Sequence, residues 1–265
     1  MLKRIISALI GIPLVLLLVY CGGLWFLGLV ILAALLGIKE FFMLLETRWR
    51  VNVLTRVAGY GGILLLLAGA YAKQDTGAFS NVIIVFILFS LVMIVMFSRL
   101  DLEELTISFW GTIYIGGLFS FLILLREMEH GKVLVITLLA GIWLYDSLAY
   151  FAGIKWGKTR ILPEVSPKKS VQGAIGGTVA VLGSVILFYS GWGEYYPLDF
   201  FYSMIFGVII ILGAPLGDFL ESALKRKLQV KDTGNLIPGH GGILDRVDSV
   251  IFTAPLVYFF VQLID

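Results

Sequence analysis

Apolar runs of about 20 residues recur along the whole of this 265-residue chain, and they limit its fold more than any other feature. A helix rises about 1.5 Å per residue, so a run of this length crosses a hydrocarbon core about 30 Å thick. Such continuous runs do not fit the alternating pattern of a membrane β-barrel. We therefore predict an all-α, polytopic integral membrane protein with about nine transmembrane helices. The expected spans are 5–20, 24–45, 55–72, 80–97, 107–125, 132–153, 172–190, 201–220 and 249–264.

The composition leaves little room for a separate water-soluble domain. Hydrophobic residues make up 59% of the chain and charged residues 14%, whereas a typical soluble domain has about 25% charged residues. The single cysteine, Cys21, excludes an intramolecular disulfide and a metal site built from cysteines. We expect one membrane domain, in which residues 1–140 are scaffold helices and residues 141–265 contain the catalytic region.

Lysine and arginine residues predict the orientation, because they gather on the cytoplasmic side of membrane proteins. With the N-terminus in the cytoplasm, the expected spans put all but three of the 20 Lys and Arg residues on that side. The exceptions are Lys73, Arg126 and Lys132. We predict a multi-pass protein of the inner (cytoplasmic) membrane with its C-terminus outside. The two longest polar loops, 154–171 and 221–248, would form an active site on the cytoplasmic face.

Four aspartates lie inside the expected spans or at their ends: Asp146, Asp218, Asp245 and Asp248. An ionised carboxylate is unfavourable in lipid, so such residues usually face a polar interior and pair with cations. Asp218 and Glu221 are three residues apart, as are Asp245 and Asp248, which places each pair on one face of a helix. Mg²⁺ takes carboxylate oxygens together with substrate phosphates. We predict Mg²⁺ as the cofactor, with Asp218 and Asp245 as main ligands and Asp248 and Asp146 as further ligands or supports.

A purely structural role is the alternative for these acids. They would then form ion pairs with nearby cations, namely Lys225, Lys231 and Arg246. Glu40, near the end of the second expected span, is a weaker candidate for chemistry. For Glu40 we expect a structural partner such as Lys39 or Arg56.

Two polar segments have the composition of phosphate-binding loops. The segment SPKKS at 166–170 places two lysines between two serines, which supply point charges and hydroxyl donors. The segment PGHGG at 238–242 lets the backbone turn tightly, and successive exposed amides in such a turn form an anion nest. His240 lies between glycines and close to charged residues, which favours a phosphate-binding or acid–base role. The alternatives are the positive-inside rule for the lysines and an ordinary loop for the glycines.

The stretch from Ser222 to Asp248 resembles the signature of the phosphatidate cytidylyltransferase family. It reads SALKRKLQVKDTGNLIPGHGGILDRVD. It matches Ser-x-x-Lys-Arg, then Lys-Asp, then Pro-x-His-Gly-Gly-x-x-Asp-Arg-x-Asp, at each fixed position. The upstream stretch DSLAYFAGIKWGKTR, followed by SPKKSVQG, is also similar to that family. The resemblance covers residues 143–250, and residues 1–140 carry no signature.

The resemblance implies a Mg²⁺-dependent enzyme that transfers the cytidylyl group of CTP to phosphatidate, giving CDP-diacylglycerol and pyrophosphate. The lipid phosphate would attack the α-phosphorus in line, assisted mainly by positioning and charge stabilisation. With the residue patterns above, it assigns catalytic roles to Asp218, Lys231, His240, Asp245, Arg246 and Asp248. The residues assigned to substrate binding are Ser166, Lys168, Lys169, Ser170, Ser222, Lys225, Arg226, Gly241 and Gly242.

Three other functions compete with this one. A related CTP-dependent enzyme would act on a different lipid by the same chemistry. A CDP-alcohol phosphotransferase is disfavoured because the DG-x-x-AR core of that family is absent. An ion-coupled transporter is the alternative from another class, since intramembrane carboxylates can be ion sites, but the polar residues here gather at one membrane face. Expected partners are CTP, phosphatidate, the lipid bilayer and a second copy of the chain in a homodimer, with no nucleic acid.

Overall fold

The computed structural model describes residues 2–48, 51–72, 87, 91, 102–193, 196–230, 233–234 and 241–264. Within this part of the chain, seven helices are long and apolar enough to cross a membrane. This finding confirms the prediction of an all-α, polytopic membrane protein. The expected span 80–97 lies outside the described residues, apart from positions 87 and 91, so the total of nine spans stays a prediction.

The chain forms two compact units. The first consists of Met1–Glu129 and Leu228–Val247, and the second of His130–Lys227 and Asp248–Asp265. Helix α10 (Leu244–Ile264) begins in the first unit and continues in the second. The predicted division at residue 140 separates scaffold helices from the catalytic region. It concerns function and not compactness, and it stays a prediction.

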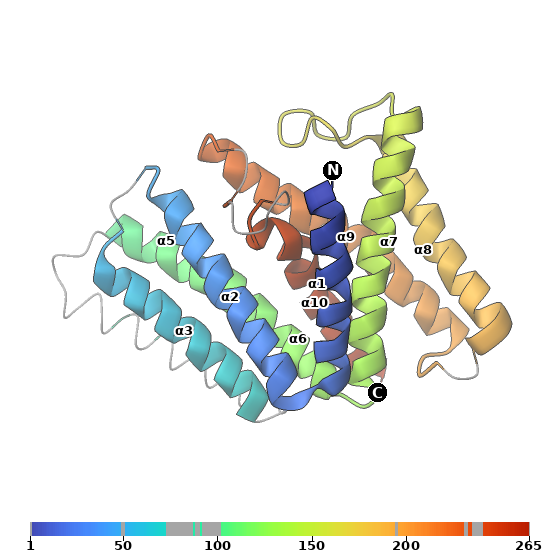
Figure 1. The fold of residues 1–265 in the computed structure, drawn as a ribbon, viewed down its shortest axis with the longest axis horizontal. Helices are drawn as coiled ribbons and strands as arrows, with labels where there is room; N and C mark the ends of the chain where they lie inside the picture. The colour runs from blue at the N-terminus through green and yellow to red at the C-terminus, as the bar shows by residue number, and fades with distance from the viewer. Residues whose placement is uncertain are drawn as a thin grey trace. The chain divides into compact units, whose positions relative to one another are not determined.

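The first unit is built around helix α2 (Gly23–Leu45), which packs against the other helices of that unit (Figure 1). Its buried residues recur every four positions at Phe26, Val30, Ala34, Ile38 and Phe42. This spacing puts them in one stripe along the helix, which faces the neighbouring helices. The other elements are α1 (Leu2–Cys21), α3 (Val53–Ala72), α5 (Leu102–Thr112), the π-helical turn η1 (Ile113–Gly117) and α6 (Leu118–Glu127).

The second unit consists of α7 (Gly131–Trp156), α8 (Val171–Trp192), α9 (Phe200–Lys227) and most of α10. Helix α7 lies along α8, and both pack against α9 (Figure 1). Ser249 of α10 donates its hydroxyl hydrogen to the Ala214 carbonyl oxygen of α9 at 2.9 Å. Helices α9 and α10 therefore meet at the ends that carry the acidic residues of the signature.

Helices α9 and α10 extend beyond the spans that hydropathy indicated. We expected a membrane span at 201–220 and a loop at 221–248, but α9 continues to Lys227 and α10 begins at Leu244. Apolar composition marks only the part of a helix that lies in lipid. The charged turns continue the helix because ESALKRK contains no proline or glycine to end it.

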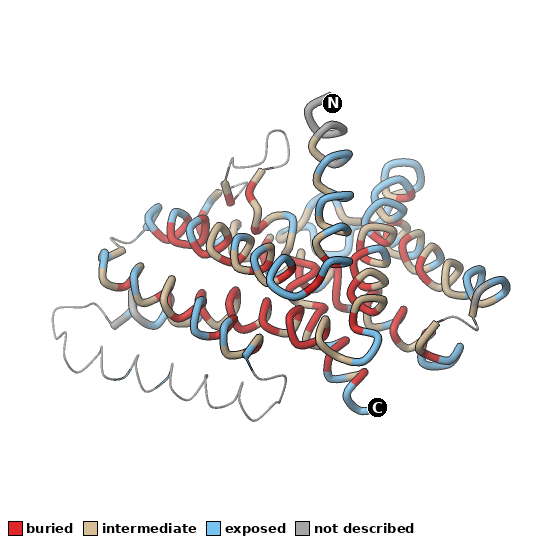
Figure 2. The backbone as a smooth tube through the Cα atoms, turned by 60° about the horizontal axis from the view of Figure 1, so that its bottom comes forward, coloured by how far each residue is buried: buried red, intermediate tan, exposed pale blue. Residues whose placement is uncertain are grey.

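Large apolar side chains remain exposed along the helices of both units. Figure 2 shows buried and exposed residues alternating along the helical tubes. In water such an exposed apolar surface is unfavourable, at about 25 cal/mol per Å², whereas lipid hydrocarbon accepts it. The exposed surface therefore fits a membrane protein. Prominent examples are Leu24, Trp25, Val53, Trp110, Phe151, Ile154, Val179, Leu187, Phe201 and Leu263.

Candidate functional site

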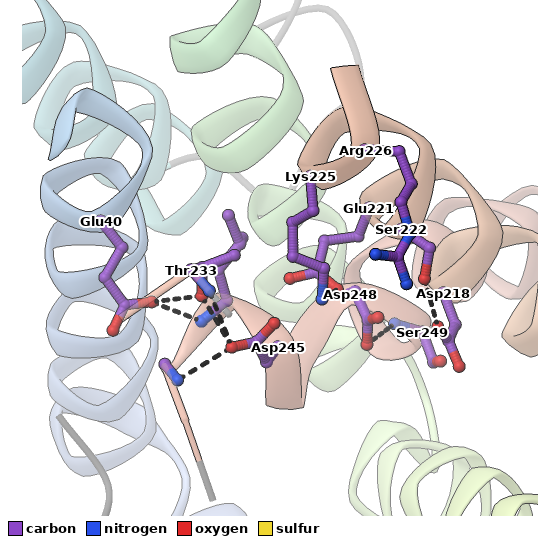
Figure 3. Close-up of polar contacts among 12 residues, drawn as sticks. Glu40, Asp218, Glu221, Ser222, Lys225, Arg226, Thr233, Asp245, Asp248 and Ser249 are labelled. Carbon is purple, nitrogen blue, oxygen red and sulfur yellow. Dashed lines mark hydrogen bonds and ion pairs between the residues drawn. The ribbon is translucent and has the colours of Figure 1, made fainter. Parts of the chain in front are cut away.

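Three carboxylates form a cluster in the second unit. Asp218 and Glu221 come from α9 and Asp248 from α10 (Figure 3). Each offers one oxygen, and the three oxygens lie within 4.8 Å of one another. Glu221 is 2% exposed and Asp248 6%, whereas Asp218 is only half-buried. We call Asp218, Glu221 and Asp248 the acid cluster; its open side is at Asp218.

Close approach of the two helices builds the acid cluster. Gly217 precedes Asp218, and a Cβ atom there would lie 2.5 Å from the Asp248 carbonyl oxygen. Glycine therefore allows the backbone of α10 to come next to α9. The Ser249 amide donates to Asp248 Oδ1 at 2.7 Å, and the Ser222 hydroxyl donates to Asp218 Oδ1 at 3.2 Å. These hydrogen bonds orient two of the three carboxylates.

Two lysines pair with the acid cluster. Lys169 Nζ lies 2.6 Å from Asp218 Oδ2, and Lys225 Nζ lies 2.8 Å from Glu221 Oε2. The Lys169 ammonium also lies 4.4 Å from the centre of the Phe219 ring. An ion pair between Lys225 and one of these acids, which the alternative structural role predicts, is therefore present. The ion pair between Lys169 and Asp218 was not predicted from the sequence.

The loop between α7 and α8 holds Lys169 in place. An antiparallel bridge joins Arg160 to Ser170, and the Ile161 amide donates to the Lys169 carbonyl oxygen at 3.2 Å. Gln172 Oε1 accepts hydrogen bonds from the backbone amides of Lys158 and Thr159, at 3.0 and 3.2 Å. Hydrogen bonds thus connect the first half of the loop to its last residues and to Gln172 of α8. These contacts limit the positions that the Lys169 side chain can adopt.

The other residues of that loop have local roles in this structure. Ser170 is the N-cap of α8, where its Oγ accepts a hydrogen bond from the Gly173 amide at 3.1 Å. Lys168 is exposed, and its carbonyl oxygen accepts from Arg160 Nη1 at 2.8 Å. The Ser166 carbonyl oxygen accepts from the Lys169 amide at 3.3 Å. Substrate contacts for Ser166, Lys168 and Ser170 stay predictions.

A second network of carboxylates lies in the first unit, where Glu40 of α2 meets Asp245 through Thr233 (Figure 3). Glu40 is buried and accepts hydrogen bonds from the Ile243 and Leu244 amides, both at 2.9 Å. The partners expected for Glu40, Lys39 or Arg56, are thus replaced by backbone groups and a hydroxyl. Arg56 pairs instead with Glu46.

Asp245 Oδ2 accepts three hydrogen bonds in this network. They come from the Thr233 amide at 3.1 Å, the Thr233 hydroxyl at 3.0 Å and the Gly242 amide at 2.9 Å. The Gly242 amide thus donates to a carboxylate of its own chain, so phosphate binding there would have to replace this hydrogen bond. Gly241 has a positive φ of 83°, as a tight turn requires.

The remaining predicted site residues are placed as follows. Asp146 is exposed on α7 and is not a member of the acid cluster, and Arg246 is exposed on α10. Arg226, also exposed, donates through Nε to the Val165 carbonyl oxygen at 3.3 Å. Lys231 and His240 lie outside the described residues. The roles assigned to these residues stay predictions.

The acid cluster has the chemistry of a magnesium site. Carboxylate oxygens are the hard donors that Mg²⁺ prefers, and the ion usually takes one or two of them together with phosphates. Two oxygens bound to one Mg²⁺ at about 2.1 Å lie no more than about 4.2 Å apart. The 4.8 Å within which the three oxygens lie is close to that limit. Asp218, Glu221 and Asp248 are therefore residues that could hold a divalent cation.

Comparisons with known proteins agree on one family. The model of the cytidylyltransferase family matches residues 2–264. A phosphatidate cytidylyltransferase from Synechocystis sp. is 34% identical over 99% of this chain and 97% of its own length. One from Bacillus subtilis is 34% identical over 98% of this chain and 97% of its own length. One from Brucella abortus is 30% identical over 97% of this chain and 92% of its own length.

Proposed function

The chain belongs to the cytidylyltransferase family, and we propose that it is a phosphatidate cytidylyltransferase that makes CDP-diacylglycerol in phospholipid synthesis. The family membership confirms the resemblance drawn from the signature. The relatives that match nearly the whole chain have that activity in their names, which supports the same reaction here.

One observation supports this reaction most strongly, namely three carboxylates beside two lysines at helix ends in a membrane protein. The reaction brings a triphosphate to a lipid headgroup. It needs a cation site for phosphate oxygens and ammonium groups for the remaining negative charge. The acid cluster offers the first, and Lys169 and Lys225 offer the second.

We assign the divalent cation, Mg²⁺, to Asp218, Glu221 and Asp248. When bound, it would neutralise phosphate charge and polarise phosphoryl oxygens. Glu221 is an addition to the ligands predicted from the sequence, and its burial with Asp248 would hold the site rigid. Ligand roles for Asp245 and Asp146 stay predictions.

The chain's own residues would position the reactants and balance their charge. An oxygen of the phosphatidate phosphate forms a bond to the α-phosphorus of CTP, and the bond from that phosphorus to the bridging oxygen breaks, releasing pyrophosphate. Lys169 and Lys225 stand beside the acid cluster and can neutralise phosphate oxygens. We assign Arg246 and Lys231 to the reacting phosphates on the basis of the signature. These are electrostatic roles, and they need no proton transfer.

The lysine and arginine distribution supports an active site on the cytoplasmic side, where CTP is available. We place the protein in the inner membrane with its N-terminus in the cytoplasm. The homodimer suggested above also stays a prediction.

Conversion of labelled CTP by the purified protein tests the function. We expect label from the α-phosphate to enter the lipid phase as CDP-diacylglycerol, with pyrophosphate in equal amount, only when phosphatidate and Mg²⁺ are present. Incorporation with another phospholipid in place of phosphatidate would point to the related lipid nucleotidyltransferase. No incorporation with any lipid, in protein that is folded, would contradict the proposal.

A further inference from the structure

Glu40 is a buried carboxylate to which the proposed reaction gives no role. It lies near the end of the apolar helix α2 and is 4% exposed. Burying a carboxylate is unfavourable unless hydrogen-bond donors satisfy it. Its donors come from the signature segment, which lies about 200 residues further along the chain.

Two of the donors lie at the start of helix α10. The Ile243 amide donates to Glu40 Oε1 and the Leu244 amide to Glu40 Oε2, each at 2.9 Å. The first amides of a helix have no partner within the helix, and this end carries a partial positive charge. A carboxylate that accepts from two of these amides is therefore a strong cap. Glu40 caps α10 from a different helix of the same unit.

Thr233 connects this cap to Asp245. Its hydroxyl oxygen lies 3.2 Å from Glu40 Oε2 and 3.0 Å from Asp245 Oδ2. The single hydroxyl hydrogen is therefore shared between two carboxylates. The Thr233 amide adds a hydrogen bond to the same Asp245 oxygen at 3.1 Å. The position of the Asp245 carboxylate thus depends on the position of Glu40.

Two glycines show how closely the backbone surrounds Glu40. A Cβ atom at Gly234 would lie 2.7 Å from Glu40 Oε1. A Cβ atom at Gly242 would collide with Glu40 Oε2 and with the Thr233 hydroxyl oxygen. Neither position accepts a larger residue unless its neighbours move. Residues 233–234 and 242–244, which the structure describes, therefore pack closely around this carboxylate.

We propose that Glu40 is a positioning residue for the cytidylyl transfer. By capping α10 and holding Thr233, it fixes the direction of the Asp245 carboxylate and the place of Arg246 in the same first turn. In this role it would act through these residues and not through contact with a substrate. This inference rests on the proposed function, in which Arg246 acts on the reacting phosphates, and on the role near the metal that the sequence predicts for Asp245.

Glu40→Gln is the main test, because an amide nitrogen cannot accept a hydrogen bond from a backbone N–H. Thr233→Val provides a second test, since it removes the bridging hydroxyl and keeps the shape. We expect both variants to lower kcat for CDP-diacylglycerol formation about tenfold or more, while each KM stays within about twofold. Thr233→Ser should restore most of the turnover that Thr233→Val loses.

Thr55→Val is the matched control, as the same substitution at a buried threonine of the same unit whose hydroxyl has no hydrogen-bond partner among the described residues. Its turnover should stay within about twofold of wild type. Hydrogen exchange gives a readout independent of activity. In Glu40→Gln we expect faster exchange confined to the amides of 241–247, and in Thr55→Val no change there.

The outcomes separate this inference from the proposed function. Normal turnover of folded Glu40→Gln and Thr233→Val, beside an active wild type, would overturn the positioning role alone. Faster exchange throughout the unit, with higher KM values and unchanged kcat, would also overturn it, because Glu40 would then serve only general stability. A wild-type protein that makes no CDP-diacylglycerol would overturn the proposed function itself.

Discussion

Gly217→Ala should push α10 away from α9 beside the acid cluster. The added Cβ would lie 2.5 Å from the Asp248 carbonyl oxygen and 2.9 Å from Phe252 Cβ, whereas ordinary contacts start at 3.4 Å. The nearest atom belongs to the backbone and cannot rotate away. Overpacking of this kind costs about 1–3 kcal/mol, and the better helix propensity of alanine offsets about 0.5–1 kcal/mol. We expect a net loss of about 1 kcal/mol.

Gly183→Ala on α8 is the matched control, because no atom of the part of the chain that the structure describes lies within 4 Å of a Cβ atom there. It should stabilise the protein by about 0.5–1 kcal/mol through helix propensity alone. The two variants should therefore differ by about 2 kcal/mol, which for a chain of this size gives about 4–8 °C between their melting temperatures.

Thermal unfolding of both variants in the same detergent measures this difference. Turnover is measured in parallel, and we expect it to fall for Gly217→Ala, since Asp248 must shift with its carbonyl group. Gly183→Ala should keep wild-type turnover. The account of how α9 and α10 meet would be refuted if Gly217→Ala melted as high as Gly183→Ala and remained fully active.

Three further predictions concern topology and the cationic residues. A reporter that is active only in the cytoplasm should be silent when fused to the C-terminus, because the charge distribution predicts that this end lies outside; an active fusion would contradict the predicted orientation. Lys169→Ala should mainly raise the KM of one substrate, as expected of a charge that holds the substrate in ground and transition states alike. Arg246→Lys should depress kcat, because a point charge cannot reproduce the planar fork of arginine. Steady-state kinetics with each substrate varied test both, and a pure KM effect for Arg246→Lys would show that its role is misassigned.

Helix positions followed from the sequence because lipid requires long apolar runs. The expected span 24–45 nearly coincides with α2 (Gly23–Leu45), and 55–72 lies within α3 (Val53–Ala72). The charged ends of α9 and α10 were missed, since hydropathy marks the lipid-embedded part and does not mark where a helix ends. Capping residues and breakers give that information, as Ser170 does for α8.

Part of the site could also be predicted from helical spacing. The three-residue separation of Asp218 and Glu221 placed both on one face of α9, and the structure brings both into the acid cluster. Long-range partners could not be predicted in this way. Neither the pairing of Lys169 with Asp218 nor that of Glu40 with the start of α10 follows from local spacing. The available signal for Glu40 was an acid, next to Lys39, in a helix that is otherwise apolar, and a buried acid requires hydrogen-bond donors or a cation.

The Mg²⁺ dependence of CDP-diacylglycerol formation tests the central claim most directly. The measurement compares wild type with the double variant Asp218→Asn, Asp248→Asn, which keeps the side-chain size and removes two of the negative charges that a divalent cation needs. The account predicts saturable Mg²⁺ activation of wild type and no recovery of the folded double variant at any Mg²⁺ concentration. Wild-type turnover of the double variant at limiting Mg²⁺ would contradict the claim that the acid cluster holds the catalytic cation.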